Sequence, residues 1–306
     1  MFKQLVDRFT TSPLIGIDIG SSVVKVVELD RSEERILLRR CATSRVEGKD
    51  LADLLRGLLE KAEITATHVS VAIASPEVIV RRFEFPPMPR KELAKAIRLE
   101  AEQEIFNGKS QSEIDWQILP STSEESLRGL LAVVPKVILA NHLKVIRMAG
   151  LKPKVADVAG LALWNAYWAL SGSRETSPKT VLLVNVGAKT TNLVIAKGPD
   201  ELVLIRDLQL GGRSLADGHE KEWTTEISDS LGYARSQGGL RQLDAVSVTG
   251  GGSGPLLKPL LESAVTAPVT LWNPLNDVTC APGLTVENGV GPLLAIAIGL
   301  ALRQPA

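Results

Sequence analysis

The residues of this 306-residue chain that are best suited to bind an anion or a cation lie close together near its start. Asp18 is a carboxylate inside an apolar run, and a buried carboxylate needs a partner, for which a hydrated cation is one candidate. Gly20 permits a sharp turn and leaves room for a ligand beside the main chain. Ser21 and Ser22 can offer hydroxyls and backbone N–H groups to an anion in that turn.

Two apolar strands must position this turn. The segment from Leu14 to Leu29 reads LIGIDIGSSVVKVVEL, with β-branched residues on both sides of Gly20, and this density favours a buried, pleated setting. Lys25 lies on the second strand, and its ammonium either adds a positive charge near a bound phosphate or points outward. The sequence therefore predicts a β-hairpin with a ligand-binding turn.

The same pattern returns in the second half of the chain, where Val181 to Ala196 reads VLLVNVGAKTTNLVIA. Two copies of one strand–turn–strand unit predict two similar domains that face a shared cleft. An amide replaces the first copy's carboxylate, and an amide cannot supply the negative charge that a hard divalent cation prefers. In this alignment Asn185 takes the place of Asp18, Gly187 of Gly20, Ala188 of Ser21, Lys189 of Ser22 and Asn192 of Lys25, and Thr190 and Thr191 keep the shape of the loop.

A third segment ends in bare backbone. Ala245 to Gly252 reads AVSVTGGG, a strand that ends in Gly250, Gly251 and Gly252, and a helical pattern follows from Pro255 to Ala264. Glycines between a strand and a helix N-terminus let a nucleotide lie against the main chain. We therefore expect these glycines to face a nucleotide.

The order of these three segments resembles that of the actin-like ATPase superfamily, with IGIDIGSS as phosphate-1, VNVGAKTT as phosphate-2 and VTGGG as the adenosine motif. Other segments narrow the resemblance to the PilM family of type IV pilus assembly, which is related to the division protein FtsA. They are RRFEFPPMPRKELAKAIRLEAEQEIF, EIDWQIL, YARSQGG and the terminal AIAIGLALR. The resemblance implies an α/β, actin-like ATPase (ribonuclease H-like) fold of two domains.

The resemblance also implies domain boundaries. We expect residues 1–75 with 131–157 to form the first actin-like domain (1A), and residues 76–130 to form an inserted subdomain 1C of the FtsA type. Residues 158–306 then form the second domain (2A). Within it, residues 213–240 stand where relatives carry a helical subdomain, 2B. Because so few residues separate Gly212 from the helix expected at Glu226 to Ser236, we expect a reduced 2B.

By resemblance, Asp18 holds Mg²⁺ through water while the turns and the triple glycine hold ATP. Hydrolysis also needs a group that positions water, and we find no candidate, so we assign no catalytic residue and expect weak ATPase activity at most. The implied role is that of an adaptor that binds the N-terminal cytoplasmic tail of a PilN-like membrane protein, with other pilus platform proteins or further copies of itself as additional partners. A cytoplasmic GspL-like component of type II secretion and a small-molecule kinase of the same superfamily remain alternatives.

Composition limits the other function classes. Lys plus Arg and Asp plus Glu each number 35, so the net charge is zero and does not call for nucleic acid or an acidic membrane surface. The two cysteines, Cys41 and Cys280, form no CxxC pattern, which fits a reducing cytoplasm. No apolar segment reaches the ~20 residues that span a bilayer. We expect a cytoplasmic protein that is peripheral at the inner membrane through its partner.

Several local elements follow from periodicity. Met1 to Thr10 favours a short amphipathic helix, and Arg35 to Cys41 a third strand. Asp50 is a suitable N-cap for a helix that runs from Leu51 to Ala62. Val155 to Trp168 begins the second half, and we expect Asp157 to cap its helix.

Overall fold

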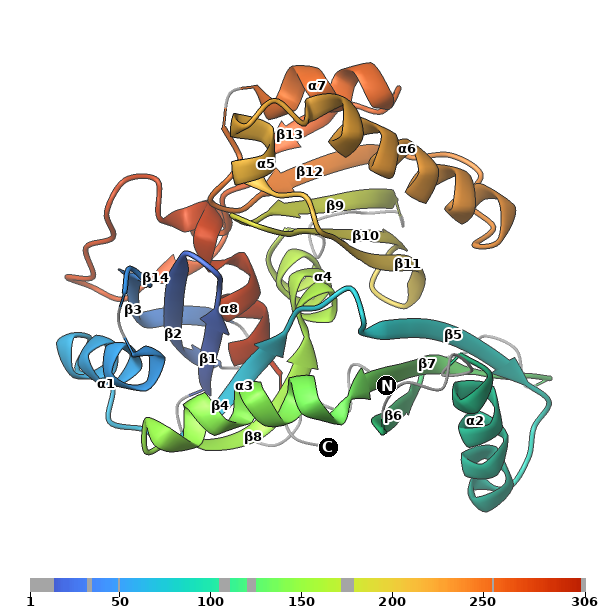
Figure 1. The fold of residues 1–306 in the computed structure, drawn as a ribbon, viewed down its shortest axis with the longest axis horizontal. Coiled ribbons are helices and arrows are strands. Elements are labelled where there is room, and N and C mark those ends of the chain that lie inside the picture. The colour runs from blue at the N-terminus through green and yellow to red at the C-terminus, as the bar shows by residue number, and fades with distance from the viewer. Residues whose placement is uncertain are drawn as a thin grey trace.

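The structure is a computed structural model that describes residues 14–31, 35–48, 50–104, 111–119, 125–171, 179–254 and 256–303. These residues form three β-sheets and the helices that pack on them (Figure 1). The helix expected at Met1 to Thr10 lies outside the described residues.

A six-stranded sheet carries the first hairpin. Its strand order is β14–β3–β2–β1–β4–β8, where β1, β2 and β3 form an antiparallel meander and β4, β8 and β14 pair in parallel. The strands are β1 (Leu14–Ile19), β2 (Val23–Arg31), β3 (Ile36–Arg45), β4 (His68–Ile73), β8 (Lys152–Val158) and β14 (Thr279–Cys280).

A five-stranded sheet repeats this arrangement around the second hairpin. Its order is β11–β10–β9–β12–β13, again an antiparallel meander followed by two parallel strands. The strands are β9 (Thr180–Val186), β10 (Thr191–Lys197), β11 (Glu201–Leu208), β12 (Ala245–Thr249) and β13 (Val269–Leu271). The two similar halves that the repeated motif predicts are therefore present as two sheets of matching topology.

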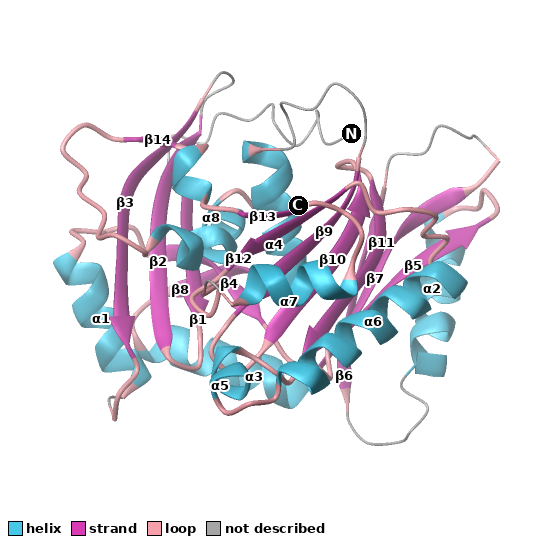
Figure 2. Cartoon of the chain, turned by 90° about the horizontal axis from the view of Figure 1, so that it is seen from above, coloured by secondary structure: helices cyan, strands magenta, loops and turns pink. Residues whose placement is uncertain are grey.

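A smaller antiparallel sheet has the order β5–β7–β6, from β5 (Ile79–Phe85), β7 (Leu127–Pro135) and β6 (Ser112–Ile118). Helix α2 (Arg90–Glu104) packs on it through Leu93 and Ile97. Figure 2 shows this sheet beside β11, at the opposite end of the molecule from β3. It lies where we expect subdomain 1C, and its relation to the FtsA insertion stays a prediction.

The helices alternate with the two larger sheets as layers (Figure 1). Helices α1 (Leu51–Lys61) and α3 (Lys136–Met148) cover the outer face of the six-stranded sheet. Helices α4 (Ala159–Leu170) and α8 (Ala295–Ala301) fill the core between the two sheets. Helices α6 (Glu220–Ser236) and α7 (Leu257–Ala264) cover the far face of the five-stranded sheet, and the short α5 (Gly212–Ala216) precedes α6.

Glycines allow the central layer to pack this closely. A Cβ on Gly299 of α8 would overlap the backbone of Ala162 in α4, and a Cβ on Gly16 of β1 would overlap the backbone of Ala297. The core between the sheets thus depends on backbone-to-backbone contact.

Two details of the local expectations are wrong, namely the cap assigned to Asp157 and the start of the helix that ends at Ser236. The stretch Lys152–Val158 is the edge strand β8, and α4 starts only at Ala159. Asp157 does not cap α4, because the N-cap residue is Val158 and no side chain accepts from the first turn of the helix. Instead, Asp157 Oδ1 accepts from the N–H of Val158, and Asp157 Oδ2 lies 3.2 Å from Nε of Arg303. Helix α6 begins at Glu220, six residues before the expected Glu226.

Other expectations are confirmed. Asp50 caps α1 by accepting from the N–H groups of Ala52 and Asp53. The domain boundaries stay a prediction. Within the range expected for the second domain, β14 pairs with β3 of the first sheet. None of the helices in the described ranges is both long enough and apolar enough to cross a membrane.

Candidate functional site

The first hairpin turn is organised by an ion pair. Asp18 and Lys25 face each other across β1 and β2, and Lys25 Nζ donates to Asp18 Oδ2 at 2.8 Å. Both side chains are largely buried, at 12% and 14% exposure. The ammonium also lies 2.7 Å from where a Cβ on Gly20 would stand. Of the two orientations left open by the sequence, Lys25 therefore faces the turn.

The second hairpin holds a neutral pair at the same register. Asn185 and Asn192 are cross-strand neighbours, and Asn185 Nδ2 donates to Asn192 Oδ1 at 2.7 Å. The alignment of Asp18 with Asn185 and of Lys25 with Asn192 thus matches the structure. Because both partners are amides, this cross-strand pair carries no charge, and the cation of the second turn is the exposed Lys189.

A carboxylate that the sequence reasoning missed continues this polar chain. Asn192 Nδ2 donates to Asp207 Oδ1 of β11 at 2.6 Å, and the backbone N–H of Ser75, beyond β4, also donates to Asp207. Burial raises the pKa of Asp207 to about 6, although both hydrogen bonds act to lower it. The feature that could have pointed to Asp207 is its cross-strand position opposite Asn192. Asp207 therefore joins the second hairpin to the first half of the chain.

Arg213, which we also did not single out, connects the two turns. Its backbone N–H donates to the carbonyl of Ala188 in the second turn at 3.0 Å. Its Nη2 donates to Ser22 Oγ in the first turn at 2.7 Å. The two turns therefore lie within the reach of one side chain, as a shared crevice between the hairpins requires. Its position directly after Gly211 and Gly212 was the available signal.

The glycine-rich strand end packs on the second turn. The N–H of Gly252 donates to Val186 O at 2.8 Å, and that of Gly212 donates to Gly187 O at 2.8 Å. Gly250 has φ +99°, and a Cβ there would also meet Asn185 Oδ1 at 2.7 Å. Gly251 is exposed, and a Cβ there would make ordinary contact with the side chain of Leu293. The fold itself therefore requires glycine at Gly250 and Gly252, whether or not a ligand binds there.

The remaining expected site residues differ in access. Ser21 is exposed, whereas Gly187, Ala188 and Thr190 are partly buried in the second turn. Thr191 is fully buried, and its hydroxyl donates to Leu210 O at 2.6 Å and accepts from Trp223 Nε1. Thr191 is thus occupied inside the fold and does not face the crevice.

Comparison with known proteins identifies the family. The family model described as "Type IV pilus assembly protein PilM" matches residues 16–229. The chain belongs to the PilM family. The solved "PilM-PilN type IV pilus biogenesis complex" matches with a TM-score of 0.80 and 28% identity, over 96% of this chain and 99% of that one.

A second solved structure shares the fold. The ethanolamine utilization protein EutJ from Carboxydothermus hydrogenoformans matches with a TM-score of 0.54 and 13% identity, over 99% of this chain and 93% of that one. Together with the repeated sheet topology, these matches confirm the actin-like ATPase fold that the motifs predict.

The side chains at the two turns of this PilM-family chain suit an anion better than a metal ion held directly by protein ligands. Its first turn offers one carboxylate, Asp18, which Lys25 already pairs, and its second turn offers the amide Asn185. Nowhere in the described ranges do three or more His, Cys, Asp or Glu side chains group as a metal site. Lys25, Lys189 and Arg213 instead bring cations to the turns, and a metal ion would reach Asp18 only through water.

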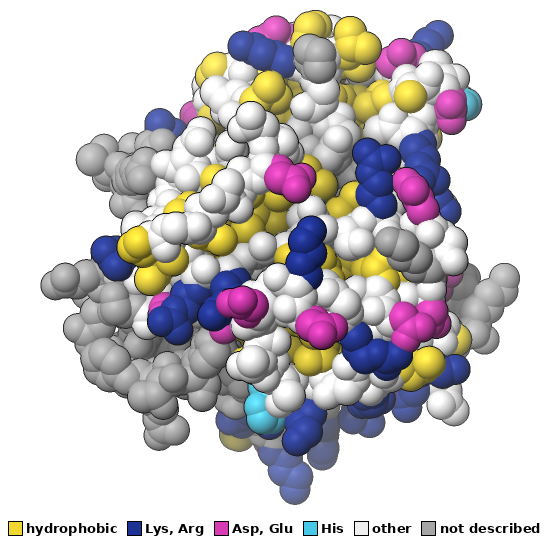
Figure 3. Space-filling model, turned by 90° about the vertical axis from the view of Figure 1, so that its left-hand side faces the viewer, with side chains coloured by type: hydrophobic (Ala, Val, Ile, Leu, Met, Phe, Trp, Pro, Cys, Tyr) yellow, Lys and Arg dark blue, Asp and Glu magenta, His cyan; other side chains and the backbone are white. Residues whose placement is uncertain are grey.

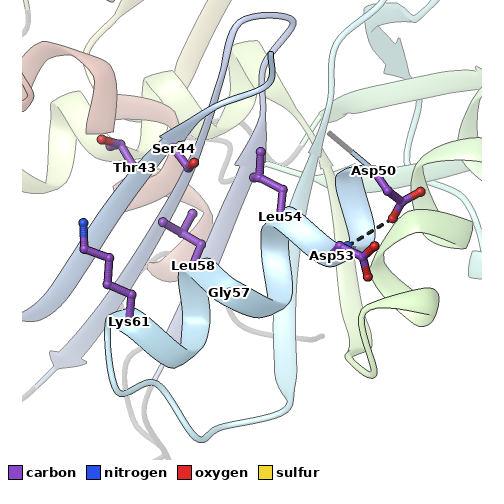
Figure 4. A pocket seen from close by; sticks show the side chains of 8 residues that line it. All are labelled: Thr43, Ser44, Asp50, Asp53, Leu54, Gly57, Leu58 and Lys61. Atoms are coloured by element: carbon purple, nitrogen blue, oxygen red, sulfur yellow. Dashed lines mark hydrogen bonds between the residues drawn. The ribbon is translucent and has the colours of Figure 1, made fainter. Parts of the chain in front are cut away.

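A groove of about 460 Å³ lies between α1 and β3, on the strand next to the first hairpin (Figure 4). Its two carboxylates are already engaged: Asp50 caps α1, and Asp53 pairs with Arg56. The groove is lined by Thr43, Ser44, Asp50, Asp53, Leu54, Gly57, Leu58 and Lys61.

Proposed function

We propose that this chain is a cytoplasmic adaptor of type IV pilus assembly that binds the N-terminal tail of a PilN-like membrane protein. The observation that carries this proposal is the match to the PilM–PilN complex over nearly the full length of both chains. The tail holds the adaptor at the inner membrane as a peripheral component.

The seam between the small sheet and the six-stranded sheet is the proposed place of the tail. The family resemblance puts the tail beside the small sheet. Arg303 closes this seam: Nη2 donates to Gln117 Oε1 on β6 at 3.3 Å, and Nε pairs with the buried Asp157 on β8. Ile118, at the end of β6, is 39% exposed and offers apolar surface there.

Calorimetric titration with a synthetic peptide tests this proposal. The peptide carries the N-terminal tail of the PilN-like protein encoded beside this chain, and a scrambled peptide is the control. We expect the tail to bind, and Arg303→Ala to weaken binding about tenfold or more, because the seam loses the contacts that join Gln117 and Asp157 through Arg303. Arg235→Ala, an exposed change on α6, should have no effect. Equal heats from the tail and the scrambled peptide would refute the proposal.

We further propose that the crevice binds ATP, with Mg²⁺ reached from Asp18 only through water. What supports this is the placement of Lys25, the Ser22 hydroxyl and Arg213 around two facing turns. A bound nucleotide would supply the phosphate charge that these cations match. Gly20 and Ser21 line the first turn, and Gly187, Ala188 and Thr190 line the second.

Titration with ATP–Mg²⁺ separates this second proposal from the first. Wild type should bind, Asp18→Ala should lose binding, and Arg213→Ala should bind about tenfold more weakly because a charge-assisted hydrogen bond is lost. Arg235→Ala again serves as the matched control. If wild type gives no heat, ATP binding is refuted, whereas binding of the tail peptide is unaffected.

A further inference from the structure

One segment of the chain concentrates positive charge. Between positions 136 and 156 the sequence carries five cations and no Asp or Glu, although the whole chain balances 35 of each sign. The segment contains α3, a short turn and β8. The cations are Lys136, Lys144, Arg147, Lys152 and Lys154. The zero net charge therefore hides an uneven distribution.

These cations gather on one side of the molecule. All five are exposed, and α3 and β8 lie together along the lower margin of the six-stranded lobe in Figure 1. Figure 3, in which the left-hand side of Figure 1 faces the viewer, shows dark-blue side chains along the lower margin of the molecule. On α3, Ile146 is fully buried, whereas Val137 and Met148 are 59% and 51% exposed. Val137, Lys144 and Met148 follow i, i+7, i+11 spacing and so share the outer face of the helix.

Most of these charges have no acidic partner. Among the described residues, Lys136 pairs with Glu113, while Lys144, Arg147, Lys152 and Lys154 make no ion pair. Lys and Pro on an edge strand prevent unwanted strand pairing, which accounts for Lys152 and Lys154 on β8. Edge protection does not account for Lys144, Arg147 and the exposed Met148, because they lie on a helix.

We propose that the outer face of α3 and β8 contacts an anionic lipid surface directly. Clustered Lys and Arg beside exposed apolar side chains are the pattern of interfacial membrane contact, in which the cations meet lipid phosphates and the apolar groups enter the headgroup region. An acidic protein is the competing occupant, and the vesicle experiment below separates the two. This contact is additional to attachment through a partner's tail, and it would orient the adaptor at the membrane.

Sedimentation of the full chain with vesicles tests this proposal. Vesicles of phosphatidylcholine alone are compared with vesicles of equal parts phosphatidylcholine and phosphatidylglycerol, at low and high salt. We expect wild type to sediment with the anionic vesicles at low salt and to be released at high salt, because salt screens exposed charge. The variant K144E/R147E should partition at least about tenfold more weakly, since each basic residue near an anionic surface contributes a severalfold effect.

The matched control is K221E/R235E on α6, which makes the same change in net charge in the layer farthest from α3. It should sediment much as wild type does. Circular dichroism of both variants would show that each is folded. The proposal is overturned if wild type stays in the supernatant with every vesicle composition, as an acidic protein partner would imply. It is also overturned if the α6 control loses as much binding as K144E/R147E.

Discussion

Two pairs of residues at equivalent positions set the electrostatics of the crevice. Asp18 and Lys25 form an ion pair in the first hairpin, and Asn185 and Asn192 form an amide pair in the second. The register is the same in both, so the fold needs only a hydrogen-bonded cross-strand pair there. The charges of the first pair are therefore not required by the hairpin fold itself.

The change Lys25→Met tests the ion pair. It leaves Asp18 largely buried without its cation, and we expect a loss of about 3 kcal/mol in the free energy of unfolding. The double variant D18N/K25M should recover part of that loss because no unpaired charge remains. Urea unfolding measures both. Equal losses in the single and double variants would contradict the assigned pairing.

Asp207 makes stability depend on pH. Its pKa is raised by burial from 3.8 to about 6, so the folded state binds this proton more tightly than the unfolded chain does. The stabilising contribution is complete below 3.8 and disappears as pH rises through about 6. Asp207→Asn should remove this dependence on pH. Compared with the difference between the two proteins in acid, the variant should gain about 3 kcal/mol in the free energy of unfolding over wild type at neutral pH. Thermal unfolding of wild type and Asp207→Asn across this pH range measures the effect. If the account of Asp207 is wrong, the stabilities of the two proteins will change in parallel with pH.

The packing of α8 against α4 governs the core at the scale of elements. Gly299→Ala places a Cβ into the backbone of Ala162, and neither backbone can yield cheaply, so we expect a loss of about 3 kcal/mol. Gly57→Ala on α1 is the control, since a Cβ there meets nothing within 4 Å. It should stabilise α1 by up to about 1 kcal/mol. Denaturant midpoints of both variants check this, and a neutral Gly299→Ala would show that α8 can move away from α4.

The sequence predicts elements well where side-chain pattern and burial agree. Both hairpins, the strand before the triple glycine and α1 with its Asp50 cap are of this kind, because their apolar periodicity is strong. Strand β8 was missed because Lys152, Pro153 and Lys154 disfavour strands, and its place at a sheet edge depends on pairing with the distant β4. Asp207 and Arg213 were missed for a related reason: their partners lie in other segments of the chain.

At the scale of the whole molecule, one topology is used twice and the two copies are joined at their turns. Arg213 holds the second turn through its backbone and the first through its guanidinium, and Asp207 reaches Ser75 of the first half. Arg303 makes a comparable link between the small sheet and β8. The molecule therefore has two seams with different chemistry, and we propose that one binds an anion and the other a peptide tail.

Hydrogen exchange of the full chain, with and without the PilN-like tail peptide, tests the adaptor role most directly. Our account predicts slower exchange in β6 and β8 on either side of Arg303, and little change in α6 and α7. Unchanged exchange throughout, or protection confined to α6 and α7, would contradict it.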